Sequence, residues 1–334
     1  MKKVLSLILA LAMVFALVAC GEKQPASDGD ASSDGDKPAR GNVIMTFGTA
    51  DTGGSMYPAG AAVSQVWTNN VEGVKCNTQT STGSFQNCQD VSTGEVDVAV
   101  ATSDVVLNAY NGTGKFADIG KLDNLRVIGA VYTSVLSGVA LKSSGLTYIH
   151  DLLGKRVAVG PAASATENAT LAAFDVMGID SSNTSLENLG LGDGADSVGD
   201  GILAAFGFAG LPIGGQLNLA ATKEIQVLDM TQEEIDKVLA GNAAYIQTKI
   251  PAGTYTGQDN DANTFGVKCL IIVTADMDAD LVYDLCKAMN EHTEELAAGN
   301  ALLKDMTDPS FLCTQMPIPL HDGAQKYYSE QGLI

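Results

Sequence analysis

Four short loops rich in Gly, Ser and Thr carry the residue types best suited to binding a small polar molecule. They are TFGTADTGGSMYPAG (46–60), QTSTGSFQ (79–86), ATSDVV (101–106) and VGPAASATENAT (159–170). Each loop follows an apolar, strand-like run and precedes a helical pattern, so each places hydroxyls and backbone N–H groups at a helix start. A helix start has unpaired N–H donors and a partial positive charge, and both favour a carboxylate or phosphate.

Helix capping is the simpler explanation for any one of these loops. Ser55 is a typical N-cap with Pro58 in the first turn, Ser103 or Asp104 opens the third helix, and Ser164 and Glu167 have the spacing of a capping box. The four loops together point to a site, because parallel strands end at one edge of a sheet and ligands bind in the crevice there.

Other chemistries lack their motifs. No Gly-Lys-Ser/Thr loop, no GxGxxG after a strand and no Gly-x-Ser-x-Gly elbow is present, and His150, His292 and His321 are far apart in the sequence. The acidic stretches 192–201 and 259–270 do not match an EF-hand. We therefore expect no catalytic residues, no metal, no cofactor and no enzymatic activity.

The cysteines give no further site. After Cys20, five remain, an odd number, and none has CxxC or metal-ligand spacing: Cys76, Cys88, Cys269, Cys286 and Cys313. We predict neither a disulfide nor a metal site, and the sequence leaves the state of each thiol open.

Strand-like and helical patterns alternate along the chain, which indicates an α/β fold. The strand candidates are 43–47, 74–80, 97–102, 125–132, 137–142, 156–160, 225–230 and 269–274, and the helix candidates are 55–69, 104–110, 164–177, 231–240 and 278–293. Two βα series with a return path indicate two lobes with parallel-type sheets, joined by a hinge. We assign residues 43–132 plus 255–334 to lobe 1 and residues 133–254 to lobe 2.

The N-terminus indicates export and anchoring. Residues 1–19 have a basic start and an apolar run too short to span a membrane, and Leu17 to Cys20 form a lipobox. Residues 20–42 are polar and rich in Ser, Asp and Gly, as in a flexible tether. We predict a lipoprotein signal peptide, lipidation at Cys20 and a location outside the cytoplasm on the cell membrane; a chance cysteine after an ordinary signal peptide is the alternative.

The net charge excludes one class of partner. The formal charge is −20, and it becomes more negative once Lys2 and Lys3 leave with the signal peptide. Nucleic acid is a polyanion that basic patches attract, so we expect no nucleic-acid partner. Aromatic residues near the loops, namely Tyr57, Tyr132 and Phe208, could wall a pocket, and core packing explains each ring about equally well.

Longer blocks of the sequence resemble a known family. TADTGGSMYPAG, STGSFQN, GEVDVAVATSDVVLNAYNG, DLLGKRVAVGPAASATE and MPIPLHDGAQKYYSEQGL, with others between them, make the chain similar to the TAXI-type solute-binding subunits of tripartite ATP-independent periplasmic (TRAP) transporters. The resemblance covers residues from about 46 to the C-terminus.

The resemblance implies a two-lobe, periplasmic-binding-protein-like fold of type II that closes on a small carboxylate or amino acid such as glutamate or glutamine. It also implies delivery of that solute to a TRAP permease in the membrane, and the lipobox fits a Gram-positive cell. The residues carried over as ligand-binding are Thr52, Gly53, Gly54, Tyr57, Ser81, Thr82, Ser84, Ser103, Ser164, Ala165 and Thr166.

Two other classes stay open. One is a binding lipoprotein of the same fold that serves an ATP-driven importer or a sensor, and the other is a surface enzyme or adhesive lipoprotein. The solute is expected to be small and anionic or zwitterionic, held by helix starts more than by a cation; Arg126 and Lys142, near the expected crossings, are the rival cations.

Overall fold

The computed structural model describes residues 41–50, 52, 54–162 and 164–334. The predicted signal peptide, Cys20, most of the tether and Gly53 lie outside the described residues. Within the described ranges, no helix combines the length and the apolar character that a membrane crossing requires.

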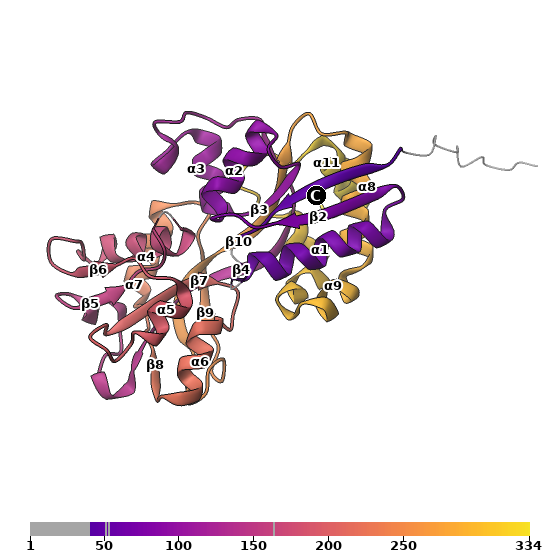
Figure 1. The fold of residues 1–334 in the computed structure, drawn as a ribbon. Coiled ribbons are helices and arrows are strands. Elements are labelled where there is room, and N and C mark those ends of the chain that lie inside the picture. Colours follow the sequence, from indigo (N-terminus) through magenta and orange to yellow (C-terminus); the bar gives the residue numbers. More distant parts are fainter. Residues whose placement is uncertain (1–40, 51, 53, 163) are drawn as a thin grey trace, which may run out of the picture. The chain divides into compact units, whose positions relative to one another are not determined.

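One mixed sheet of ten strands runs through the folded part of the chain, with the order β2-β1-β3-β10-β4-β7-β5-β6, and with β8 on β4 and β9 on β10 (Figure 1). The strands are β1 Val43–Gly48, β2 Val74–Gln79, β3 Val98–Thr102, β4 Leu125–Leu141, β5 Arg156–Ala158, β6 Ser185–Glu187, β7 Ala204–Ala209, β8 Ile225–Val227, β9 Ile246–Ile250 and β10 Ala262–Thr274. The two predicted strands 125–132 and 137–142 are one strand, β4, because no turn residue interrupts the run between them.

Five of the helices in the described residues were predicted, with ends within about two residues of the observed ones, and six were not. The helices lie between the strands and after the last strand. They are α1 Met56–Asn70, α2 Ser84–Thr93, α3 Ser103–Asn111, α4 Ala165–Val176, α5 Leu191–Asp196, α6 Gly214–Thr222, α7 Gln232–Gly241, α8 Ala279–Glu291, α9 Thr293–Gly299, α10 Pro309–Cys313 and α11 Asp322–Glu330, with 3-10 turns η1 Gly114–Phe116, η2 Lys142–Ser144, η3 Ile149–Leu152 and η4 Ala301–Thr307. The α/β class is confirmed.

Lobe 1 is built on β1, β2, β3 and the adjoining halves of β4 and β10. Alternate residues of each strand face opposite sides of the sheet, so β3 sends Val98 and Val100 into a core with α1 and α8. Ala99 and Ala101 of the same strand pack with α2 and α3 on the other side. Both faces are therefore covered, which explains why β3 reads as an unbroken apolar run.

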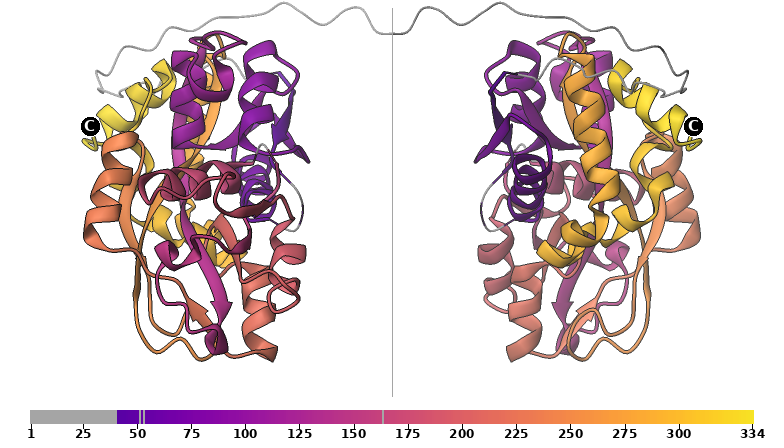
Figure 2. Two further views of the ribbon diagram at one scale, coloured as in Figure 1. Left: turned by 90° about the vertical axis from the view of Figure 1, so that its left-hand side faces the viewer. Right: turned by 90° about the vertical axis from the view of Figure 1, so that its right-hand side faces the viewer.

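Lobe 2 repeats this plan around β5, β6 and β7. Phe206 and Phe208 of β7 pack with α4 and α7, whereas Ala205, which precedes Phe206, packs with α5 and α6 on the other face. The views in Figure 2 show helices on both sides of the long strands. The alternation of large and small residues along β7 thus decides which helices each face of the sheet can hold.

Two long antiparallel strands, β4 and β10, pass from one lobe to the other (Figure 1). They approach so closely that a Cβ at Gly266 would lie 2.4 Å from Ser134 O, so the crossing requires glycine there. Two α/β lobes joined by a pair of crossing strands form the periplasmic-binding-protein-like fold of type II.

Further details differ from the expectation, and three of the strands, β6, β7 and β9, were not among the predicted ones. The sheet is mixed, since β4 and β10 run antiparallel to their neighbours. In addition, Tyr255 and Ala262 pack in lobe 2, as do Phe265 and Val267. The chain therefore returns to lobe 1 closer to residue 268 than to the predicted residue 255, while the other predicted limits stay predictions.

Candidate functional site

The loops of lobe 1 meet at one edge of the sheet. Ser84 Oγ accepts hydrogen bonds from Thr102 N at 3.1 Å and from Thr102 Oγ1 at 3.3 Å, which ties the start of α2 to the end of β3. Ser81 Oγ donates to Thr49 O at 2.9 Å and accepts from Gly83 N at 2.9 Å. Ser81, Ser84 and Ser103 thus lie close together, as the sequence predicts.

Asn87 holds this edge together, although the sequence analysis did not single it out. Its side chain is fully buried, and Nδ2 donates to Thr49 O at 2.6 Å and to Val100 O at 2.7 Å. The amide therefore bridges the ends of β1 and β3. In the sequence, only the position of Asn87, shortly after the Ser/Gly loop 81–84, could have indicated this role.

The N-cap side chains of the three lobe-1 helices do not cap them, although in α3 the Asp104 carboxyl hydrogen-bonds the backbone of Val105 in the first turn. The N-cap residues Ser55, Gly83 and Thr102 make no capping hydrogen bond to α1, α2 or α3. Ser55 stands at the N-cap of α1, as predicted, but its hydroxyl does not cap the helix because it accepts a hydrogen bond from Gly210 N instead. Uncapped helix starts retain the donors and the partial charge that favour a polar or anionic group.

Lobe 2 uses its loop hydroxyls internally. Ser164 Oγ accepts from Glu167 N at 3.1 Å and so caps α4, as predicted. Thr166 Oγ1 accepts from Phe208 N at 3.2 Å, and Thr166 is buried. This hydroxyl therefore fastens α4 to the end of β7, a role that its sequence position did not reveal.

Several polar contacts join the two lobes at these same loops. Ser55 Oγ accepts from Gly210 N at 3.2 Å, and Ser103 Oγ donates to Ala244 O at 3.4 Å. Lys115 Nζ forms an ion pair with Glu167 Oε2 at 3.1 Å. The lobes are thus in contact along the edge where the strand ends and helix starts gather.

Both lobes line one small cavity at this contact. Its walls are Phe85, Val105, Asn108, Lys115 and Phe116 of lobe 1 with Ser164, Ala165 and Asn168 of lobe 2. Its volume of ≈ 20 Å³ is about enough for a single water molecule. A solute of amino-acid size could enter only if the lobes stood further apart.

The other predicted site residues fall outside this cavity. Thr52 and Thr82 are exposed, Gly54 and Tyr57 are half-buried at the start of α1, and Phe208 is buried beside α4. Tyr132 is fully buried in the core of lobe 1, where burial raises the pKa of its phenol. Tyr132 therefore packs in the core, as the alternative interpretation stated, and does not line this cavity.

The two rival cations do not lie at the crossing. Arg126 is at the start of β4 and donates to the backbone O of Asp123 and Leu125, whereas Lys142 follows the other end of this 17-residue strand. The expectation that both sit near the crossings is wrong, because the two short predicted strands are one long strand. Lys115, which the sequence analysis passed over, is the cation that lines the cavity.

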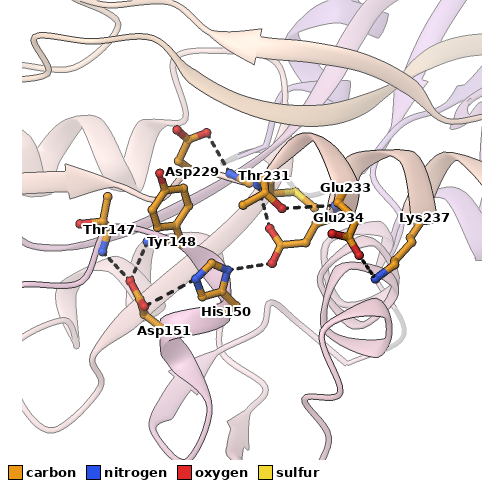
Figure 3. A network of polar contacts seen from close by, with 10 residues as sticks. Thr147, Tyr148, His150, Asp151, Asp229, Thr231, Glu233, Glu234 and Lys237 are labelled. Carbon is orange, nitrogen blue, oxygen red and sulfur yellow. Dashed lines mark hydrogen bonds and ion pairs between the residues drawn. The ribbon is translucent and has the colours of Figure 1, made fainter.

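A second polar cluster lies inside lobe 2 (Figure 3). His150 Nδ1 is 2.7 Å from Glu234 Oε1, and its ring stacks on Tyr148 with centroids 5.0 Å apart. Glu234 Oε2 also accepts from Thr231 N at 2.8 Å, which completes a capping box at α7. The cluster fastens η3 to the start of α7 and confirms that Thr231 to Glu234 is a helix start.

The five described cysteines are buried and unpaired: Cys76, Cys88, Cys269, Cys286 and Cys313. Burial raises the pKa of the Cys76 and Cys269 thiols to about 11. Within the described ranges no three His, Cys, Asp or Glu side chains gather as metal ligands would. These thiols therefore belong to the core.

The fold and the gathered loops define the class: a two-lobe protein with the architecture of the periplasmic solute-binding proteins. Within that class, the model of the NMT1-like family matches residues 47–332, and the chain belongs to this family.

Solved structures with a similar course of the chain share little sequence with it. The alkanesulfonate-binding protein SsuA from Xanthomonas axonopodis pv. citri, bound to MOPS, is 13% identical over 88% of this chain and 85% of its own, with a TM-score of 0.47. A putative L-cystine ABC transporter protein from Listeria monocytogenes is 16% identical over 78% and 95%, with a TM-score of 0.46. An ancestral arginine-binding protein bound to arginine is 11% identical over 81% and 99%, with a TM-score of 0.48.

The assignment to the TAXI-type subunits of TRAP transporters is wrong. The family whose model covers the chain is the NMT1-like family. The expected TRAP permease partner and the expected glutamate or glutamine ligand both came from that resemblance. Neither expectation is therefore supported.

Proposed function

We propose that the protein is a solute receptor that captures a small anionic or zwitterionic molecule between its lobes and performs no chemistry on it. The observation that carries the proposal is the meeting of the lobes at their loop edges. Ser55 and Ser103 of lobe 1 contact lobe 2 there, beside the starts of α1 and α2, which have no side-chain caps. Free N–H donors at helix starts suit a carboxylate, a sulfonate or a phosphate.

The size of the cavity supports capture by closing. The cavity of ≈ 20 Å³ between the lobes is smaller than any amino acid needs. A solute would therefore bind while the lobes are apart and become enclosed as they approach. Neither lobe alone offers the full set of partners, so the solute would favour the closed arrangement by its additional contacts there.

With the TRAP assignment withdrawn, the remaining transport partner is an ATP-driven importer, and a sensor of the same fold is the second candidate. We propose that the receptor acts outside the cytoplasm, held to the membrane of a Gram-positive cell by a lipid on Cys20. Mass spectrometry of the mature N-terminus tests the anchor: diacylglycerol on Cys20 supports it, and a mature N-terminus elsewhere without lipid contradicts it.

A thermal-shift screen tests the binding proposal. The panel contains amino acids, dicarboxylates, phosphate and alkanesulfonates, each at millimolar concentration. A solute present at 100 times its dissociation constant stabilises the folded state by about 2.7 kcal/mol. We expect at least one anionic or zwitterionic member to raise the melting temperature by several degrees. A response only to neutral sugars or to polycations would contradict the proposed solute class.

A further inference from the structure

A fully buried carboxyl group lies where the two lobes meet. Asp104 belongs to the first turn of α3 in lobe 1, and its relative exposure is 0%. Its Oδ2 accepts a hydrogen bond from Asn168 Nδ2 at 3.1 Å and another from Tyr245 OH at 3.5 Å. Both of these donors come from lobe 2, so these two contacts exist only while the lobes are together, whereas Thr102 and the backbone of Val105 hydrogen-bond the carboxyl from within lobe 1.

The second oxygen of the carboxyl has no partner. Asp104 Oδ1 is buried and accepts no hydrogen bond, and none of the ion pairs among the described residues includes Asp104. Burying a charge without a counter-ion is costly, and a group in that position tends to become neutral. A proton on Oδ1 would remove the charge of Asp104.

The groups around Asp104 supply no positive charge that would hold it ionised. Its titratable neighbours are the Cys88 thiol on α2, the Cys269 thiol on β10 and the Tyr245 phenol. Burial raises the pKa of all three, so they stay neutral. The Lys115–Glu167 pair crosses between the lobes nearby, with its own charges matched.

Two features favour the ionised form of Asp104, but the effect of burial, which favours the neutral form, is larger. The start of α3 favours a negative charge, and the hydrogen bonds of Thr102 and Asn168 lower the pKa of Asp104. Desolvation is nevertheless the larger effect and raises the pKa of Asp104 above its ordinary value. Separating the lobes would admit water and remove this effect.

We propose that Asp104 is a proton-linked latch, protonated while the lobes are closed and ionised while they are open. Closing then takes one proton from solvent onto Oδ1, and opening returns it. The proposal rests on the closing motion proposed above but not on the identity of any solute. Since one proton is bound, the equilibrium between open and closed forms changes by up to about tenfold per pH unit between the two pKa values. Acid favours the closed form.

The distance between spin labels on the two lobes tests the latch directly. Thr93→Cys on α2 and Asp175→Cys on α4 place labels at exposed positions of lobe 1 and lobe 2. The five described cysteines are buried, and the sixth, Cys20, is replaced by Ser in the sample. The chain without the new cysteines should then take up no label. Distances are recorded by double electron–electron resonance from pH 8 to pH 4.5, with no solute added.

We expect the short-distance population to grow as the pH falls. Asp104→Asn, which keeps the shape and stays neutral, should hold that population high at every pH. Asp118→Asn removes an exposed acid from lobe 1 and should behave as the unsubstituted chain does. A distribution that ignores pH overturns the latch, and so does a pH response that Asp104→Asn retains. If the Asn variant does not fold, the pH series of the unsubstituted chain decides alone. Without solute in the sample, a negative result leaves the solute-binding proposal standing.

Discussion

Replacing Thr166 tests whether its hydroxyl fastens α4 to β7. Thr166→Val keeps the shape of the side chain and removes only the hydroxyl. The buried N–H of Phe208 would then lose the acceptor that lies 3.2 Å away. Leaving a buried donor unsatisfied costs about 1–3 kcal/mol, so we expect the free energy of unfolding to fall by about that amount.

Thr166→Ser is the matched control because it keeps the hydroxyl and removes the methyl group. That methyl contacts the region of Gly160, where an added Cβ would lie 2.5 Å from Thr166 Cγ2. Losing one buried methyl costs about 0.8 kcal/mol, so the Ser variant should be the more stable of the two. Urea denaturation followed by circular dichroism gives both values. The assigned role would be refuted if the Val variant were as stable as the unsubstituted chain. It would also be refuted if the Ser variant were less stable than the Val variant.

Two further substitutions address the same edge. Ser164→Ala removes the cap on Glu167 N and should lower the free energy of unfolding by about 1 kcal/mol in urea denaturation; an unchanged midpoint would show that the hydroxyl does not cap α4. Lys115→Gln breaks a partly exposed ion pair between the lobes. It should change the ratio of open to closed populations in the spin-label experiment by no more than about fivefold, and by less in high salt. A larger change that persists at 1 M salt would contradict a screened surface pair.

Much of the fold was predictable because it depends on local patterns. Apolar alternation and turn residues placed α1, α4 and α7 correctly, and the predicted helix 231–240 begins at Thr231, the N-cap of α7. The error at β4 has a physical cause: Thr133 and Ser134 follow the first predicted run and are not apolar, but a strand buried between β10 and β7 can hold small hydroxyl residues. The mixed direction of the sheet was also hidden, since strand direction depends on long-range pairing.

The site was predictable only in part. The gathering of Ser81, Ser84 and Ser103 follows from parallel strands that end at one edge, and this rule requires no knowledge of side-chain contacts. The contacts of Asp104 with Asn168 and Tyr245 join residues 64 and 141 positions apart. Such pairs exist only once the two lobes meet, so local pattern could not identify them.

Small-angle scattering with a solute from the thermal-shift panel tests the central claim, that a solute is captured between closing lobes. The sample is held at pH 7.5, and calorimetry first establishes the concentration that saturates the protein. The account predicts a smaller radius of gyration in the saturated sample than in the solute-free one. An unchanged radius of gyration, with saturation shown by calorimetry, would contradict capture by closing.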